Sequence, residues 1–341
     1  MTDKVKKLAP EIWEAISKSK KVLLHCHRDP DGDSVSSALS MMFALKNIGK
    51  EVVVISGDSE KPDFLHSLPG FSEIKRAGYG DINPAEFDLF IVLDSSDVSR
   101  VSKKIPVVFS ETMMVVNIDH HESNNNFGKI NLVDSSYPAS CQILFDLFTL
   151  WKVEITPDMA LCLYVGMFTD TGGFKYPPVS ADTLLAAGEM ARINPNFPKV
   201  IFEIENSNDQ QWIKFLGVAL SEVKVYFSGK VAISQISNSL IKEKNLSLNS
   251  ISKAEISNML KSVVGWNLGI CLVEEEPGFV TLSIRTRDAV KFQVSKLAVA
   301  LGGGGHPAAG GATIQKPFDE AVKLLLETIA KVYPELTKSD G

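Results

Sequence analysis

Residues 21–33 read KVLLHCHRDPDGD, and this stretch decides the fold. Residues 21–24 form a short apolar run, which predicts a buried strand. Residues 34–46 carry apolar side chains at helical spacing. The acidic turn between them is therefore predicted at the carboxyl end of a strand and the start of a helix. Ligands bind at this position in open α/β sheets.

The turn itself is crowded with ionisable side chains. A metal ion would offset their mutual repulsion, because it prefers negatively charged ligands. An ordinary polar turn capped by Asp33 is the competing interpretation, and this stretch alone leaves both open. An EF-hand calcium loop is excluded, since Ser34 and Ser40 stand where glycine and glutamate are required. The ionisable residues in question are His25, His27, Arg28, Asp29, Asp31 and Asp33.

The composition is that of a globular protein and argues against several other classes. The 341 residues, of which 45% are hydrophobic and 22% charged, are enough for two globular domains. A net charge of −6 argues against a protein that coats long duplex nucleic acid. The 4 cysteines are far apart and form no CxxC pair, which argues against a zinc ribbon or a disulfide framework. No signal peptide or membrane span is expected, so we expect a cytoplasmic protein without a membrane partner.

Strands and helices alternate after the acidic turn, which predicts a mainly parallel sheet. Polar residues follow these strands, and the carboxyl ends of parallel strands lie at one edge of a sheet. Asp94, the triplet Asp119-His120-His121, and Asp170 at a helix end are therefore expected to converge on the acidic turn. The predicted strands are 51–55, 87–93, 107–108 and 113–118, and the predicted helices are 137–151, 157–168 and 181–193.

The pattern changes in the second half of the chain. Two predicted hairpins, 223–237 and 268–285, are interleaved with helices at 251–264, 292–301 and 318–332. The whole chain is thus expected to be α/β, with a mainly parallel-sheet domain over 1–190 and a smaller α+β domain over 216–341. Residues 200–222 form a long, mixed and helix-prone stretch. We expect a helical connector between the two domains over 191–215.

A run of four glycines precedes His306. It lacks the strand–turn–helix context of a dinucleotide fingerprint, and no Walker A lysine follows. Two interpretations remain open. The run is either a flexible loop or a cradle whose bare amides bind a phosphate, with His306 and Arg285 nearby.

Several motifs together resemble the DHH phosphoesterases. Asp119-His120-His121 is similar to the family signature, and the motifs around His27, Asp94 and Asp170 follow the family's order. The segment from Arg285 to His306 resembles the associated DHHA1 domain. The resemblance covers nearly the whole chain and is strongest to the stand-alone NrnA-like branch. Ser36 departs from the family, which usually has glycine there.

The resemblance implies a two-metal site, and the mixed histidine and carboxylate donors suit Mn²⁺ or Mg²⁺. It implies His27 and Asp31 on one ion, Asp33 and His120 on the other, Asp94 bridging, and Asp170 completing the site. Asp94 and His121 are the implied catalytic residues, and Asp119 orients a neighbouring histidine. The implied substrate-binding residues are Arg285, Gly303, Gly304, Gly305 and His306.

The function implied by this resemblance is hydrolysis of very short oligonucleotides (nanoRNA, pApA-type dinucleotides) and of 3'-phosphoadenosine 5'-phosphate (pAp) to mononucleotides. A homodimer is one oligomeric state that we consider. Three alternatives remain at this stage. The same site would serve a cyclic dinucleotide (c-di-AMP type) phosphodiesterase. A manganese inorganic pyrophosphatase has similar first-domain motifs, but its Ser-Arg-Lys-Lys type signature is missing here. A non-catalytic nucleotide-binding protein is disfavoured by the complete ligand set.

Overall fold

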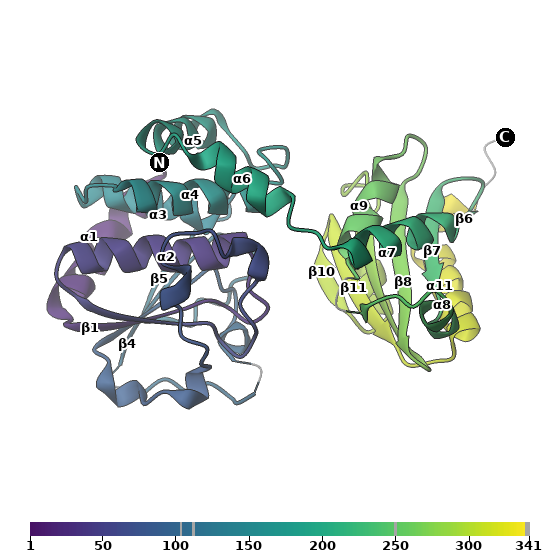
Figure 1. The fold of residues 1–341 in the computed structure, drawn as a ribbon, viewed down its shortest axis with the longest axis horizontal. Coiled ribbons are helices and arrows are strands. Elements are labelled where there is room, and N and C mark those ends of the chain that lie inside the picture. The colour runs from purple at the N-terminus through teal and green to yellow at the C-terminus, as the bar shows by residue number, and fades with distance from the viewer. Residues whose placement is uncertain (103, 111–112, 249–250, 338–341) are drawn as a thin grey trace. The chain divides into compact units, whose positions relative to one another are not determined.

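The computed structural model describes residues 1–102, 104–110, 113–248 and 251–337. The chain divides into two compact units, Met1–Ser207 and Asn208–Gly341. Each unit is built around a sheet of its own, as Figure 1 shows. No helix in the described part of the chain is long and apolar enough to span a bilayer.

The first unit contains a five-stranded sheet in the order β2-β1-β3-β4-β5. Every pairing in it is parallel, which confirms the predicted α/β architecture. All five carboxyl ends consequently lie at the same edge of the sheet. The strands are β1 Lys21–His25, β2 Glu51–Ile55, β3 Leu89–Leu93, β4 Met114–Asp119 and β5 Ile130–Val133.

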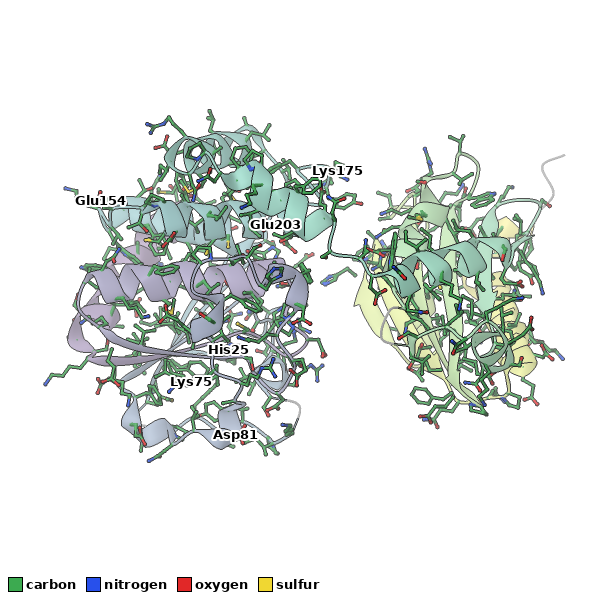
Figure 2. All side chains as sticks on the ribbon, viewed as in Figure 1. His25, Lys75, Asp81, Glu154, Lys175 and Glu203 are labelled. Atoms are coloured by element: carbon green, nitrogen blue, oxygen red, sulfur yellow. The ribbon has the colours of Figure 1, made fainter. Side chains whose placement is uncertain are left out.

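The two faces of this sheet bury different sets of side chains, because residues alternate along each strand. Leu24 and Ile91 pack into the core beneath the helices, whereas Leu23 and Phe90 face the segments that precede and follow β3. His25 is fully buried inside this unit, while Glu154 and Lys175 lie on its surface (Figure 2). The helices of the first unit are α1 Asp3–Lys18, α2 Gly32–Asn47, α3 Ser140–Leu150, α4 Pro157–Asp170, α5 Ala181–Ile193 and α6 Phe197–Glu205.

Close packing of α2 against α4 sets the position of the polar edge. A Cβ atom added to Gly32, the first residue of α2, would lie 2.1 Å from Oγ1 of Thr169. Only glycine therefore lets the start of α2 approach the end of α4 this closely. The packing brings Asp33, in the first turn of α2, near Asp170, the last residue of α4.

Two details of the first unit differ from the sequence-based prediction. Residues 107–108 do not form a strand, because β3 pairs directly with β4 and Val108 is 80% exposed. Strand β5 was not predicted. It has four residues, and the side chain of Asn131 binds the backbone of Gly128, which interrupts the apolar pattern.

The helix-prone stretch 200–222 covers the end of one helix and the whole of the next. Helix α6 ends at Glu205, and α7 spans Gln210–Ser221. The side chain of Asp209 accepts a hydrogen bond from the backbone N–H of Trp212 at 2.7 Å, which starts the second helix anew. The division between the two compact units falls in this interruption.

The second unit is an α+β fold, as predicted, with a six-stranded sheet in the order β10-β11-β9-β8-β7-β6. Only β7 and β8 pair in parallel. Helices α10 and α11 cover one face of the sheet, and α7 and α9 cover the other. The strands are β6 Val223–Tyr226, β7 Val231–Ile236, β8 Leu268–Glu276, β9 Phe279–Thr286, β10 Gly304–His306 and β11 Ala309–Ile314. The helices are α7, α8 Asn238–Glu243, α9 Lys253–Ser262, α10 Val294–Ala300 and α11 Phe318–Val332.

The glycine run is not a loop throughout, because Gly304–His306 forms the edge strand β10 and pairs with β11. A Cβ atom on Gly303 would lie 2.1 Å from the carbonyl oxygen of Gly311. Gly305 has φ +146, and a Cβ atom there would lie 2.3 Å from the carbonyl oxygen of Ala309. These two glycines are therefore required by the hairpin itself.

Candidate metal centre

Histidines and carboxylates meet at the carboxyl edge of the first sheet. His27 follows β1, Asp94 follows β3, and His120 and His121 follow β4. Potential donor atoms lie within 4.8 Å of one another in three groups. Two of them share no residue with each other: one is His27, Asp31 and Asp94, and the other is Asp33, His120 and Asp170. The third, Asp94, Asp119, His120 and His121, overlaps with both.

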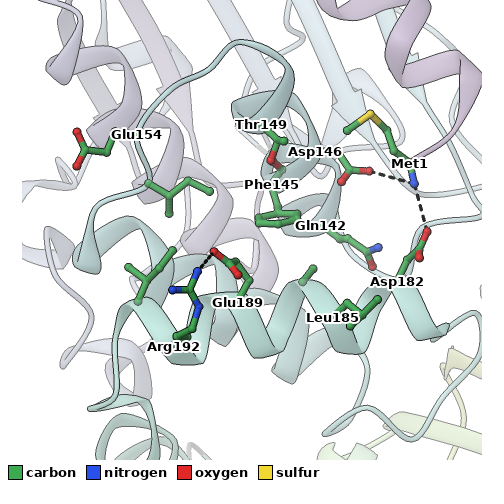
Figure 3. A pocket seen from close by; sticks show the side chains of 13 residues that line it. Met1, Gln142, Phe145, Asp146, Thr149, Glu154, Asp182, Leu185, Glu189 and Arg192 are labelled. Atoms are coloured by element: carbon green, nitrogen blue, oxygen red, sulfur yellow. Dashed lines mark hydrogen bonds and ion pairs between the residues drawn. The ribbon is translucent and has the colours of Figure 1, made fainter.

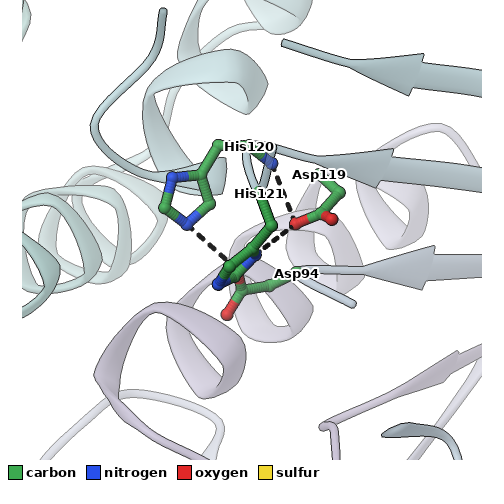
Figure 4. Close-up of side chains that lie close together, drawn as sticks. All are labelled: Asp94, Asp119, His120 and His121. Atoms are coloured by element: carbon green, nitrogen blue, oxygen red, sulfur yellow. Dashed lines mark hydrogen bonds and ion pairs between the residues drawn. The ribbon is translucent and has the colours of Figure 1, made fainter. Parts of the chain in front are cut away.

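Asp94 belongs to the first of these two groups and also faces His120 of the second. Its Oδ2 is 3.5 Å from Nε2 of His27, and its Oδ1 is 3.4 Å from Nε2 of His120. Figure 4 shows Asp94 facing His120 and His121 from the end of the neighbouring strand. Asp94 is 2% exposed and has a φ of 52°, a backbone conformation that is costly for a non-glycine residue. One buried carboxylate thus offers one oxygen to each group.

Backbone carbonyls fix the tautomers of both histidines. Nδ1 of His27 lies 2.9 Å from the carbonyl oxygen of Arg28, and Nδ1 of His120 lies 3.3 Å from that of Tyr137. A carbonyl oxygen can only accept, so Nδ1 carries the proton in each neutral ring. The Nε2 lone pairs then face the carboxylates. This is the second-sphere arrangement that orients metal-ligating histidines.

The amino terminus of α3 anchors the carboxylates. Asp33 accepts hydrogen bonds from the backbone N–H groups of Ser140 at 2.6 Å and Cys141 at 3.0 Å. The hydroxyl of Ser140 donates to Oδ1 of Asp94 at 3.2 Å. The positive end of the helix dipole favours this negative charge. A Cβ atom on Gly166 would lie 2.9 Å from Oδ1 of Asp33, so a glycine on α4 leaves room for the carboxylate.

Asp119 is completely buried and orients His121. Its Oδ1 lies 2.7 Å from Nδ1 of His121 and accepts a hydrogen bond from the backbone N–H of His120 at 2.8 Å. Its Oδ2 accepts from the side-chain amide of Asn124 at 2.6 Å. These bonds hold the His121 ring beside Asp94, whose Oδ1 is 3.6 Å from Nδ1 of His121 (Figure 4).

The donor set fits divalent metal ions. Nε2 of His120 is buried and has no hydrogen-bond partner, although it faces two carboxylates, so an ion between them would satisfy it. In the described part of the chain, no cysteine belongs to either group of donors. Imidazole nitrogens and carboxylate oxygens without thiolates suit Mn²⁺ or Mg²⁺ better than structural zinc.

Comparison with known proteins agrees with this geometry. The DHH family, N-terminal domain, matches residues 21–167, and the DHHA1 domain matches residues 228–333. A protein from Thermus thermophilus, named bifunctional oligoribonuclease and PAP phosphatase NrnA, is 30% identical over 343 residues, covering 97% of each chain.

The chain belongs to the DHH family. A Bacillus subtilis protein with the same name is 26% identical over 331 residues, covering 94% of this chain and 98% of that one. A crystal structure of an exopolyphosphatase-related protein from Bacteroides fragilis has the same fold. It superposes with a TM-score of 0.89 at 24% identity over 98% of both chains. DHH phosphoesterases depend on divalent metal ions, in agreement with the cluster of acidic and histidine side chains found here.

Burial and charge shift the pKa values of the histidines in the metal-free DHH centre. Burial lowers the pKa of His27, but the neighbouring Asp31 and Asp94 outweigh it and raise the pKa to about 10. Burial likewise opposes protonation of His120, and Asp94 raises its pKa to about 10. Without metal, both rings therefore hold an extra proton at neutral pH.

The carboxylates divide into two kinds. Burial, with the nearby Asp94, raises the pKa of Asp33 to about 7, and burial with Asp33 raises that of Asp170 to about 8. Burial favours a raised pKa for Asp94 as well, but His120 and His27 outweigh it and hold the pKa of Asp94 well below the usual range. Asp94 is thus the carboxylate that stays ionised between two cationic rings.

The DHHA1 unit aligns the predicted substrate residues in one row. His306 on β10 is paired with Ala309 on β11, which is paired with Arg285 on β9. Arg285 donates from Nη1 to the hydroxyl of Ser283 at 3.1 Å and to the carbonyl oxygen of Ile284 at 3.0 Å. A Cβ atom added to Gly304 would meet no other atom within 4 Å, so the space beside its Cα is open.

Sequence reasoning did not identify Ser140, Gly166 or Arg100 as part of this region. Arg100 ends the short helix η5, Val98–Arg100, and its Nη2 lies 3.1 Å from each ring nitrogen of His27. Its only signal was its position six residues after Asp94. Ser140 and Gly166 are small residues inside apolar helical patterns and carry no chemical signature.

A separate cavity of about 840 Å³ on the first unit shares no lining residue with the metal centre (Figure 3). Most of its charged groups pair with one another, and Glu154 is the described exception among the lining residues. The Met1 amine lies 3.7 Å from Asp146 and 3.3 Å from Asp182, and Arg192 pairs with Glu189 at 2.5 Å. The cavity contains no histidine among its described lining residues, and none of these residues belongs to the donor groups, so the metal centre is the candidate for chemistry.

Proposed function

We propose that this chain is a metal-dependent phosphoesterase that hydrolyses very short oligonucleotides, such as pApA, and pAp to mononucleotides. The observation that carries the proposal is Asp94, which offers one carboxylate oxygen to each of two donor groups. The two relatives named bifunctional oligoribonuclease and PAP phosphatase support the substrate class. Because such nucleotides are intracellular, the proposed activity is cytoplasmic.

Two Mn²⁺ ions, or Mg²⁺ ions, fit the proposal. His27 and Asp31 would hold one, Asp33, His120 and Asp170 would hold the other, and Asp94 would serve both. Bound divalent ions supply Lewis acidity and activate water for attack on phosphorus. The two donor groups and the orphaned Nε2 of His120 support this assignment.

His121 has the proposed role of stabilising negative charge on the phosphoryl oxygens. Its Nδ1 lies 2.7 Å from Oδ1 of Asp119, which fixes the ring beside Asp94. Burial opposes protonation of His121, but Asp119 and Asp94 raise its pKa overall. A donor held in place before the reaction is most effective where charge develops in the transition state.

In the DHHA1 unit we assign substrate binding to Arg285, His306 and the amides of Gly303, Gly304 and Gly305. Arginine and bare amides both recognise phosphate, and the row from His306 to Arg285 brings such groups to one edge of the sheet. We further propose that residues 1–190 and 216–341 act as catalytic and substrate-binding domains, that 191–215 connects them, and that the protein works as a homodimer.

The test is incubation of the protein and Mn²⁺ with pApA, pAp, cyclic di-AMP and pyrophosphate in separate reactions. We expect AMP from pApA and from pAp. Cleavage of pyrophosphate alone, or of cyclic di-AMP alone, would overturn the proposal. Inactivity towards all four substrates with metal bound would show a binding protein instead.

Substitution of Asp94 tests the observation on which the proposal rests. Asp94→Ala should abolish turnover, because both donor groups lose the carboxylate between them. Asp182→Asn is the matched control, since Asp182 is an exposed carboxylate that pairs with the Met1 amine. Undiminished activity of Asp94→Ala would refute the metal assignment.

A further inference from the structure

The guanidinium of Arg100 lies beside the metal centre. The backbone carbonyl oxygen of Arg100 accepts a hydrogen bond from the N–H of Arg28 at 2.8 Å, which ties the end of η5 to the loop that carries His27. Nη2 of Arg100 lies 3.1 Å from both Nδ1 and Nε2 of that histidine. Arg100 is partly buried.

Among the described residues, His27 is the only hydrogen-bonding contact of the Arg100 guanidinium, which leaves most of its donor capacity for another group. A single N–H cannot point along the lone pairs of two nitrogens in the same ring, so Nη2 packs against the imidazole. Nδ1 of His27 also carries a proton directed at Arg28, and a protonated nitrogen accepts no hydrogen bond. The guanidinium has five N–H donors in a planar fork.

No carboxylate of the described residues forms an ion pair with Arg100. Two of the other three arginines of the same unit have such partners, since Arg192 lies 2.5 Å from Glu189 and Arg76 lies 3.7 Å from Glu60. A cation that is partly buried without an anion is costly, and proteins retain such groups where a ligand supplies the charge.

The charge balance of the centre points to the missing anion. The four carboxylates Asp31, Asp33, Asp94 and Asp170 contribute −4. Two divalent cations would contribute +4 and neutral histidines nothing, so these two groups would sum to zero. The buried Asp119 lies outside both groups and pairs with His121. The charge of Arg100 is then unbalanced, and a phosphate oxyanion at the centre would balance it. The planar fork of arginine matches two phosphate oxygens.

We propose that Arg100 binds the phosphoryl group of the substrate at the metal centre. This inference rests on the proposed function, which it deepens by adding a phosphate ligand from the DHH unit itself. Arg100 would hold non-bridging oxygens of the reacting phosphate and offset the negative charge that builds up on them during hydrolysis.

The experiment compares wild type, Arg100→Gln and Arg100→Lys, with Arg192→Gln as a control for loss of an exposed arginine. Mn²⁺ stoichiometry and affinity, the unfolding temperature, the affinity of inorganic phosphate for the Mn²⁺-loaded protein, and kcat and KM for pApA are measured. In Arg100→Gln we expect unchanged Mn²⁺ binding and unfolding. Phosphate affinity should fall at least about tenfold and kcat/KM about 10²–10³-fold. Arg100→Lys should be intermediate, because it keeps the charge without the fork.

Unchanged phosphate affinity in Arg100→Gln would overturn the inference. So would a parallel loss of Mn²⁺ binding or unfolding temperature in both Arg100 variants, because that result would assign Arg100 a structural role. Failure of the proposed function is a separate outcome. If wild type binds phosphate, Arg100→Gln does not, and neither hydrolyses any substrate, the phosphate site is supported while the proposed reaction is rejected.

Discussion

The backbone N–H of Ser140 donates a hydrogen bond to Oδ2 of Asp33 at 2.6 Å, and both residues are buried. These residues are 107 positions apart in the chain. The bond joins the first turn of α2 to the first turn of α3 at the polar edge of the sheet. The geometry of the metal centre therefore depends on a residue that is not itself a candidate ligand.

Replacement of Ser140 by alanine tests the second bond of this residue, which its hydroxyl donates to Asp94. Ser140→Ala removes the hydroxyl that donates to Oδ1 of Asp94 but keeps the backbone N–H that binds Asp33. We expect the fold to persist and Mn²⁺ affinity or kcat to fall about 10- to 100-fold, as for other groups that orient metal ligands. Titration calorimetry and steady-state kinetics measure both quantities. Ser136→Ala, at an exposed position, is the control, and equal behaviour of the two variants would contradict this role.

A methyl group at Gly166 should disturb the same region from α4. In Gly166→Ala, the added Cβ would lie 2.3 Å from Sγ of Cys141 and 2.9 Å from Oδ1 of Asp33. We expect the free energy of unfolding to decrease by about 1–3 kcal/mol, as for overpacked cores. Chemical denaturation provides the measurement.

Gly188 offers a matched control for that substitution. It lies in helix α5, and a Cβ atom there would meet nothing within 4 Å. Gly188→Ala should therefore stabilise the protein by about 0.5–1 kcal/mol, because alanine favours helix. Equal effects of the two substitutions would show that the space beside Asp33 is not restricted.

The metal-free protein should lose stability as pH rises. The folded state retains protons on Asp33 and Asp170, whose pKa values are about 7 and about 8, and on His27 and His120, at about 10. The unfolded chain releases them near pH 4 for the carboxyls and near pH 6.5 for the histidines. Because the folded state binds more protons between these limits, stability falls with increasing pH.

Thermal unfolding in a chelator, between about pH 6 and about pH 9, measures this effect. We expect a lower unfolding temperature at the higher pH and a weaker decline in Asp94→Asn, which lacks the carboxylate that raises the pKa of both histidines. Saturating Mn²⁺ should also weaken the decline, since bound metal requires deprotonated donors. A metal-free protein that gains stability towards pH 9 would contradict the prediction.

The glycine run allows the hairpin to be separated from substrate binding. Gly303→Ala would place Cβ 2.6 Å from Cα of Ala312, so we expect it to disrupt β10 and lower stability by about 1–3 kcal/mol. Gly304→Ala meets no atom within 4 Å and should leave unfolding unchanged. If the amides of the run bind phosphate, Gly304→Ala should raise KM for pApA, because its methyl group occupies the open side. An unchanged KM would argue against that role.

Much of the first unit could be predicted because buried parallel strands leave a clear sequence pattern. Runs such as 89–93 are wholly apolar, and the polar residues that follow them mark the edge where a parallel sheet gathers its loops. The grouping of His27, Asp31 and Asp94 could be expected from this rule, together with the family resemblance, but the distances between them could not.

The features that escaped prediction depend on contacts between distant segments. β10 was missed because glycine favours turns, and only its pairing with β11 makes it a strand. Arg100 was missed for a similar reason. A surface arginine and an arginine beside a metal ligand look alike in sequence, and only the fold distinguishes them.

The two donor groups draw on residues from His27 to Asp170, which come from four strand or helix ends and the turn that follows β1. The last donor, Asp170, is the final residue of α4, so a chain that stops short of it cannot assemble both groups. During synthesis, metal capture must therefore wait until most of the first unit has emerged from the ribosome. Binding of the ions then acts as a late checkpoint, since it stabilises only chains in which the sheet and α4 have already come together.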